Sequence, residues 1–342
     1  MSVVQPLVAP FPWFGGKRAV AAEVWARLGD CTNFVEPFFG SGAVLLARPH
    51  APQTECVNDA DHFLVNLWRA IQADPDAVAH YADWPVNEAD LQTRHYWLVT
   101  EGAARIAACA GDLAHHDAQV AGFWLWGACA WIGSGWCSGE GPWAWGSDGW
   151  AQRQLPHLSA GRGINRQLPH LSAGRGINRQ LPHLGDAGRE RLTFIQDWLR
   201  AISARLRHVR VACGDWSRVC GDSVTWRHGL TGVFLDPPYG VDDRAGVYTH
   251  DCRDVAAQAR IWAIEAGNRP DMRVALAGYD TEHEMPAGWT AWAWKAKGGY
   301  GSQGSGQGRD NCARETIWFS PACIQPARAQ RGLFDAPKQA AE

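Results

Sequence analysis

Asp236-Pro237-Pro238-Tyr239 follows the apolar run Val233-Phe234-Leu235, which is typical of a short buried strand. Neither proline has a backbone N–H, so a strand or a helix ends there. The four residues therefore predict a stiff turn at the carboxyl end of a strand, where open α/β sheets bind their ligands. A carboxylate, a backbone carbonyl and an aromatic ring together suit a planar base with an amino group. Taken alone, the turn is explained equally well as a strand-ending loop capped by Asp236.

The length, net charge and cysteine content of the chain limit the classes of protein to consider. A length of 342 residues indicates one large domain or a domain with an insertion. The formal net charge of −3 gives no overall signal for nucleic acid, so such a signal must be local. The ten cysteines are scattered, without metal-ligand spacing, and predict thiols in a reducing compartment and no metal site. We expect no signal peptide and no membrane span, hence a cytoplasmic protein.

Two glycine-containing motifs lie near the start. Gly15-Gly16 allows a close backbone approach, and Lys17 stands where a helix is predicted to begin. A cation there opposes the helix dipole, which favours a functional use over a solvated lysine only in combination with other motifs. Residues 33–46 read as strand, glycine turn and helix, and Gly40 and Gly42 are expected to expose backbone N–H groups. The turn lacks both the P-loop pattern and the full GxGxxG pattern.

A second strand is predicted to end at Asn58-Asp59. An acidic residue there is placed to accept hydrogen bonds from the two hydroxyls of a ribose. Alternatively, Asp59 caps the helix predicted from about Asp61 to Ala73. In the first turn, Glu36 is a candidate acceptor for an amine.

Four motifs in this order resemble one known family. The stretches WFGGK from Trp13, FVEPFFGSGAV from Phe34, NDAD from Asn58 and DPPY from Asp236 are similar to the Dam-type (D12 class) N6-adenine DNA methyltransferases. The resemblance covers residues from about 11 to 75 and 208 to 321. It implies an α/β fold of the S-adenosylmethionine (SAM)-dependent, Rossmann-like kind. The expected sheet is mixed, mostly parallel with a terminal antiparallel hairpin, and carries an inserted target-recognition region.

The resemblance also implies a division of the chain and a set of site residues. Residues 1–75 and 208–321 would form a discontinuous catalytic domain that binds SAM, 76–207 the target-recognition insertion, and 322–342 a disordered tail. Asp236, Pro237 and Tyr239 would hold the target adenine. Asp215 would face the amino group of the SAM adenine and Trp216 its ring, although Asp215 also suits a cap of the next turn. The cofactor-binding positions would be Trp13, Lys17, Phe34, Glu36, Phe38, Gly40, Gly42, Asp59, Asp215, Trp216 and Asp236.

The insertion contains a repeat of thirteen residues. Residues 153–165 recur letter for letter at 166–178, and a partial third copy ends at Leu184. Between 151 and 184 no Asp or Glu offsets the arginines, which favours contact with DNA phosphates over a tolerated, duplicated surface loop. The candidate nucleic-acid-binding residues are Arg153, Arg162, Arg166, Arg175 and Arg179.

Further elements follow from hydrophobic periodicity. The arginines of the amphipathic helix at 189–207 are expected to form a solvated face near DNA. Predicted helices are 114–132, 189–207 and 254–267, and predicted strands are 209–213, 273–278, 289–296 and 315–319, the last two paired as a hairpin.

The resemblance implies a site-specific enzyme that methylates the N6 amino group of a flipped-out adenine in double-stranded DNA. Three alternatives stay open: methylation of cytosine N4, methylation of adenine in RNA, and a non-catalytic DNA-binding protein with a silent SAM pocket. The chemistry requires neither a metal nor a dedicated base such as His250. Because the sequence contains no nuclease motif, a restriction endonuclease partner would be a separate chain in the bacterial or phage-infected cell.

Overall fold

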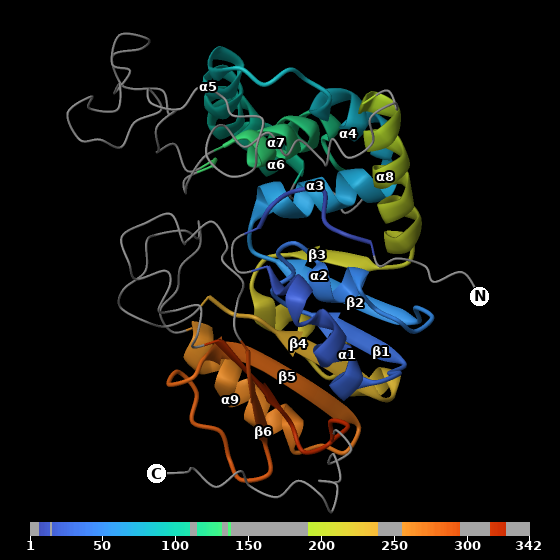
Figure 1. The fold of residues 1–342 in the computed structure, drawn as a ribbon, viewed down its shortest axis with the longest axis vertical. Coiled ribbons are helices and arrows are strands. Elements are labelled where there is room, and N and C mark those ends of the chain that lie inside the picture. Colours follow the sequence, from blue (N-terminus) through green and yellow to red (C-terminus); the bar gives the residue numbers. More distant parts are fainter. Residues whose placement is uncertain are drawn as a thin grey trace, which may run out of the picture.

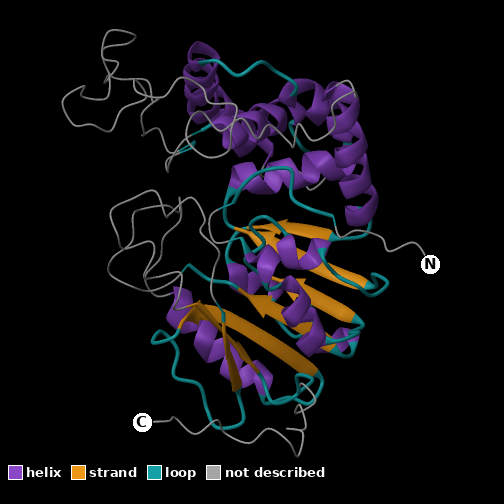
Figure 2. Cartoon of the chain, in the orientation of Figure 1, coloured by secondary structure: helices purple, strands orange, loops and turns teal. Residues whose placement is uncertain are grey.

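The computed structural model describes residues 7–13, 16–109, 115–131, 136–137, 191–238, 255–294 and 315–325. These residues form one seven-stranded sheet, with helices beside it and a layer of helices beyond its β3 edge (Figures 1 and 2). The strand order is β3-β2-β1-β4-β5-β7-β6. The strands are β1 (Asn33–Glu36), β2 (Thr54–Asp59), β3 (Arg210–Cys213), β4 (Thr231–Leu235), β5 (Met272–Tyr279), β6 (Thr290–Ala293) and β7 (Glu315–Phe319).

The sheet is parallel from β3 to β5 and antiparallel beyond. Val35 of β1 lies opposite Cys56 of β2 and Val233 of β4 in parallel registers. Strand β7 runs antiparallel to both β5 and β6, and it separates these two strands in the sheet. The predicted fold class, a mostly parallel sheet with a terminal antiparallel hairpin, is confirmed.

The residue range of each predicted helix contains one helix of the structure. Helix α1 begins only at Ala21, and Lys17 lies in the 3-10 turn before it, so its charge is not part of the first turn of α1. The helices are α1 (Ala21–Leu28), α2 (Ala43–Leu46), α3 (His62–Ala73), α4 (Pro75–Ala82), α5 (Glu88–Trp97), α6 (Ala103–Cys109), α7 (Ala118–Ala130), α8 (Arg191–Leu206) and α9 (Val255–Gly267). Shorter helical turns are Lys17–Ala19, Leu98–Gly102, Trp216–Val219 and Trp226–His228.

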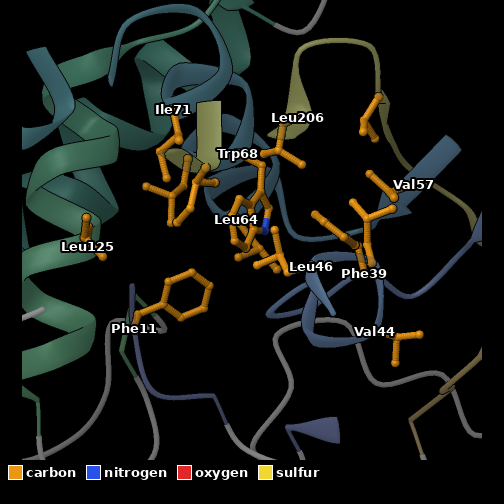
Figure 3. Packing of buried hydrophobic residues seen from close by; sticks show 14 of the residues in the cluster. Phe11, Phe39, Val44, Leu46, Val57, Leu64, Trp68, Ile71, Leu125 and Leu206 are labelled. Atoms are coloured by element: carbon orange, nitrogen blue, oxygen red, sulfur yellow. The ribbon is translucent and has the colours of Figure 1, made fainter. Parts of the chain in front are cut away.

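Alternate residues of the central strands pack into two separate hydrophobic clusters, as the period of a strand requires. Phe234 belongs to the larger cluster, which also contains residues of α1, α3, α7 and α8. Its neighbours Val233 and Leu235 belong to a second cluster with residues of α9. Figure 3 shows Trp68 and Ile71 of α3 in the larger cluster together with Leu125 of α7 and Leu206 of α8. The helical layer and the sheet therefore share one continuous core.

Ion pairs attach α8 to the rest of the fold. Two guanidinium nitrogens of Arg205 lie 2.6 and 2.8 Å from the carboxylate oxygens of Glu55 on β2. Arg200 pairs with Asp76 of α4 at 2.7 Å, and Arg191 pairs with Asp83. The prediction that the α8 arginines form a solvated face is wrong for Arg205, whose side chain is 13% exposed, whereas that of Arg200 is 51% exposed. Their position near DNA stays a prediction.

One expectation about the end of the chain is modified by the packing. The predicted tail begins too early, because Cys323 is 4% exposed and the Ile324 N–H donates to the Arg27 carbonyl at 2.8 Å. Residues 326–342 lie outside the described residues. Where the structure describes the chain, eight cysteines are free thiols, none of the helices is long and apolar enough to cross a membrane, and no cluster of potential metal ligands occurs.

Candidate active site at the carboxyl edge of the sheet

A row of carboxylates lies along one edge of the sheet. Glu36 ends β1, Asp59 ends β2, Asp215 follows β3 by one residue and Asp236 directly follows β4. Because these four strands are parallel and adjacent, their carboxyl ends meet at the same edge. The structure therefore brings together the acidic residues of motifs that are up to two hundred residues apart in the sequence.

The proline turn is partly described. Asp236 is half-buried and Pro237 is buried against the fold. Tyr239, the predicted aromatic partner of the adenine, lies outside the described residues, as does His250. The Lys17 ammonium lies 3.1 Å from Oδ2 of Asp236. Lys17 is 5% exposed, so this cation is directed into the site and is not a solvated lysine.

The glycine turn between β1 and α2 has a geometry that requires glycine. Gly40 and Gly42 have φ angles of +49° and +62°, which side chains rarely adopt. A Cβ atom at Gly40 would come within 2.7 Å of Nε1 of Trp13, so the turn packs directly on this first-motif residue. The Gly40 N–H donates to Asp59 and the Gly42 N–H to the Phe39 carbonyl. The N–H groups of the two glycines themselves are therefore bonded within the fold.

Asp59 connects the glycine turn to the start of α3. Its Oδ2 accepts from the Gly40 N–H at 2.8 Å, and its Oδ1 accepts from the Asp61 N–H at 3.0 Å. Burial raises the pKa of Asp59 to about 6, although these backbone N–H donors oppose the rise. The cap of α3 is Asp61 and not Asp59, because Asp61 accepts from the N–H groups of Phe63 and Leu64. Asp59 is thus available for a role at the site.

Glu36 is the most deeply buried member of the row, with 2% of its surface exposed. Its Oε2 accepts from the Leu45 N–H at 3.2 Å. Burial raises the pKa of Glu36 well above its usual range, and the nearby carboxylates of Asp236 and Asp59 add to this rise. Glu36 thus lies near the acidic groups that end β2 and follow β4.

An aromatic wall lies at the β3 end of the row. Trp216 stacks on Phe38 with ring centroids 5.8 Å apart and an interplanar angle of 27°. Asp215 accepts from the Ser217 N–H at 3.0 Å and caps the turn at Trp216–Val219. Asp215 therefore caps the next turn, which was the alternative explanation for this residue. Its contact with a SAM adenine stays a prediction. Phe34 is fully buried beneath the site in the larger cluster.

One acidic residue of the site was missed by the sequence reasoning. Glu315 Oε2 lies 3.7 Å from the Lys17 ammonium. Glu315 begins β7, which is antiparallel to β5, and it pairs with Tyr279 at the carboxyl end of β5, so it lies at the same edge as Asp236. The available signal was the predicted hairpin itself, because the first residue of a strand antiparallel to the central strands must lie at their carboxyl edge.

Part of the chain is similar to a known family. Residues 13–110 match the model of the D12 class N6 adenine-specific DNA methyltransferases. This stretch includes Trp13, Lys17, the glycine turn and Asp59, whereas Asp236 lies beyond it. A DNA N-6-adenine-methyltransferase of Escherichia phage P1 is 29% identical over 90 residues, which cover 25% of this chain and 12% of that relative. The resemblance inferred from the motifs is confirmed over the matched residues.

The remaining candidate residues lie elsewhere. Residues 138–190, which contain the repeat, are outside the described residues. The assignment of Arg153, Arg162, Arg166, Arg175 and Arg179 to phosphate binding therefore stays a prediction. The same holds for the cofactor and substrate roles of the residues that the structure places along the sheet edge.

Proposed function

We propose that this chain transfers a methyl group from SAM to the N6 amino group of a flipped-out adenine in double-stranded DNA. The observation that carries the proposal is the meeting of Asp236 and Lys17 beside the glycine turn and Asp59, at the carboxyl edge of one sheet. The family match at 13–110 supplies the class of reaction. We further propose that residues 76–207 recognise the target site and that the protein acts in the cytoplasm of a bacterial or phage-infected cell, with any restriction endonuclease as a separate chain.

The residues present fit SAM. The side chains along the edge are acidic, which suits a sulfonium and an amino group, and the absence of a side chain at Gly40 lets Trp13 pack on the glycine turn. Asp59 would accept from the ribose hydroxyls, and Asp215 with Trp216 would bind the adenine. Trp13, Lys17, Glu36, Phe38, Gly42 and Asp236 would complete the pocket, whereas Phe34, which is fully buried, would support it only through the position of β1. When bound, SAM supplies an electrophilic methyl group on its sulfonium.

The amino nitrogen of adenine is a poor nucleophile because its lone pair is delocalised into the ring. Asp236 and the Pro237 carbonyl would each accept one of its hydrogens, which localises the lone pair on nitrogen. Tyr239 would hold the ring face to face and so fix the direction of attack. As the nitrogen gains positive charge, the Asp236 carboxylate stabilises it.

A methyl-transfer assay tests the proposal against its alternatives. The purified protein is incubated with labelled SAM and either duplex DNA or RNA, and the products are digested to nucleosides. Label in N6-methyladenine from DNA is the expected result. Label in N4-methylcytosine, or in RNA alone, would redirect the proposal to those substrates, and no label in either polymer would leave a DNA-binding protein with a silent SAM pocket.

The pKa of Asp59 gives a prediction for SAM binding. Ribose hydroxyls donate to the ionised carboxylate, so a proton on Asp59 opposes binding. Because the pKa of Asp59 is about 6, we expect the affinity for SAM to fall below pH 6, by up to about tenfold per pH unit. Titration calorimetry at pH 5 to 8 measures this. The Asp59→Asn variant should bind more weakly at pH 7.5 and lose the pH dependence, and a dependence unchanged from wild type would contradict the assignment.

The repeat gives a prediction for DNA binding. Deletion of residues 166–178 removes two of the five candidate arginines. The slope of log affinity against log salt should become shallower by about 1.8, or about 0.9 for each lost phosphate contact. Fluorescence anisotropy with a labelled duplex at several salt concentrations measures the slope. An Arg166→Gln, Arg175→Gln variant separates charge from length, and an unchanged slope in both variants would exclude phosphate contact.

A further inference from the structure

Lys17, near the start of the sequence, lies close to two carboxylates from its last third. Its ammonium is 3.1 Å from Oδ2 of Asp236 and 3.7 Å from Oε2 of Glu315. The side chains of Lys17, Asp236 and Glu315 are 5%, 22% and 12% exposed. Only the first two belong to the recognised motifs. The role of Glu315 is therefore not explained by the proline turn or by the first motif.

The sheet fixes where Glu315 stands. Its backbone pairs with Tyr279 of β5, and its carbonyl accepts from the Trp294 N–H at 3.0 Å. The next residue, Thr316, is opposite Gly278 on one side and Ala293 on the other. Because β7 is held between two strands, the origin of the Glu315 side chain cannot shift without disrupting the sheet. The backbone of Glu315 is thus fixed by the sheet next to the side chain of Lys17.

The Glu315 carboxylate is placed at a cost to stability. Its Oε2 is buried and has no hydrogen-bond partner among the described residues. The distance of 3.7 Å to Lys17 exceeds hydrogen-bond length, so the attraction is between charges. Burial raises the pKa of Glu315, whereas Lys17 lowers it. A buried carboxylate with so little compensation is typical of a group retained for function.

We propose that Glu315 is a positioning residue that holds the Lys17 ammonium, so that Lys17 orients the Asp236 carboxylate toward the target amino group. This proposal rests on the proposed function. With one carboxylate, the ammonium would neutralise Asp236 and weaken it as an acceptor. With the carboxylates of both Asp236 and Glu315, the cluster formed with the Lys17 ammonium keeps a net negative charge. This charge stabilises the positive charge that develops on the amino nitrogen. Glu315 therefore acts on the chemical step and not on binding.

The test is Glu315→Gln, which keeps the size of the side chain and removes its charge. We expect kcat to fall by about 10- to 100-fold, as for other small errors in the placement of a reacting group. KM for DNA and the dissociation constant for SAM should stay within about twofold, and the thermal midpoint should be unchanged or higher because a desolvated charge is lost. Glu315→Asp keeps the charge and should restore part of kcat. Glu284→Gln, at an exposed carboxylate, is the matched control.

A double-mutant cycle identifies the path through Lys17. In a Lys17→Met background, Glu315→Gln should change kcat by less than about twofold, because the residue through which it acts is gone. The proposal is overturned if kcat of Glu315→Gln stays within twofold of wild type, or if that variant loses its cooperative unfolding and so reveals a structural role. Wild-type protein that transfers no methyl group rejects the proposed function itself, and the Glu315 role with it.

Discussion

Substitution of Asp236 by alanine is expected to reduce methyl transfer by about 10³-fold or more, since it removes the acceptor that activates the amino group. The protein should remain folded. Lys17 keeps the Glu315 carboxylate at 3.7 Å, so the buried cation is not left without an acidic neighbour. Incorporation of labelled methyl into duplex DNA measures the loss, and thermal unfolding checks the fold.

The control for this experiment is a carboxylate outside the sheet edge. Asp222 is exposed, so Asp222→Ala should keep full turnover. Asp236→Asn is a second arm, because it retains a side-chain oxygen but loses the charge, and we expect it to fall between wild type and the alanine variant. Turnover retained by Asp236→Ala would remove this residue from the mechanism.

The largest effect on stability is expected for Glu55→Ala. The Glu55 side chain is 2% exposed and accepts from Arg48 at 3.0 Å and from Arg205 at 2.6 Å. Its removal leaves the guanidinium groups of Arg48 and Arg205 without this carboxylate, and the Arg48 side chain is fully buried. Breaking a buried pair in this way costs about 3 to 5 kcal/mol in the free energy of unfolding. Urea denaturation followed by circular dichroism measures the change.

Asp76→Ala provides a matched comparison. The Asp76–Arg200 pair also attaches α8 to a neighbouring helix, but its side chains are 48% and 51% exposed. Exposed pairs contribute about 0 to 1 kcal/mol, so this variant should unfold within 1 kcal/mol of wild type. Equal losses in the two variants would show that burial does not distinguish the two ion pairs.

Local signals in the sequence predicted the strands, whereas the mostly parallel arrangement of the sheet was implied by the family resemblance. Apolar runs that end at Pro237 and at the Gly40 turn define β4 and β1, and the alternation at 289–296 and 315–319 defines the hairpin. The contacts of charged side chains were harder to predict. The arginines of the amphipathic helix α8 were predicted to form a solvated face, yet Arg205 pairs with Glu55 of β2, and only the packing of α8 on β2 decides this. Likewise Asp61 and Asp59 are two residues apart, and only geometry shows which of them caps α3.

Glu315 had no local signal of its own. It is separated from Lys17 by almost the whole chain, and the two meet because β7 reverses direction between β5 and β6. A sequence pattern predicts that a strand exists. It does not predict which distant residues will contact the first residue of that strand. Tyr239 and the arginines of the repeat were predicted from motif and composition, and they lie outside the described residues.

The acidic rim formed by Asp59, Asp215, Asp236 and Glu315 would affect how a polyanion approaches. Phosphates are repelled by such a rim, so the backbone of a duplex cannot rest directly on it. An uncharged nucleobase that leaves its stack meets no such barrier. Electrostatics at this rim would thus admit a single extruded base while keeping the rest of the double helix at a distance, and the grip on the phosphates must come from elsewhere in the chain.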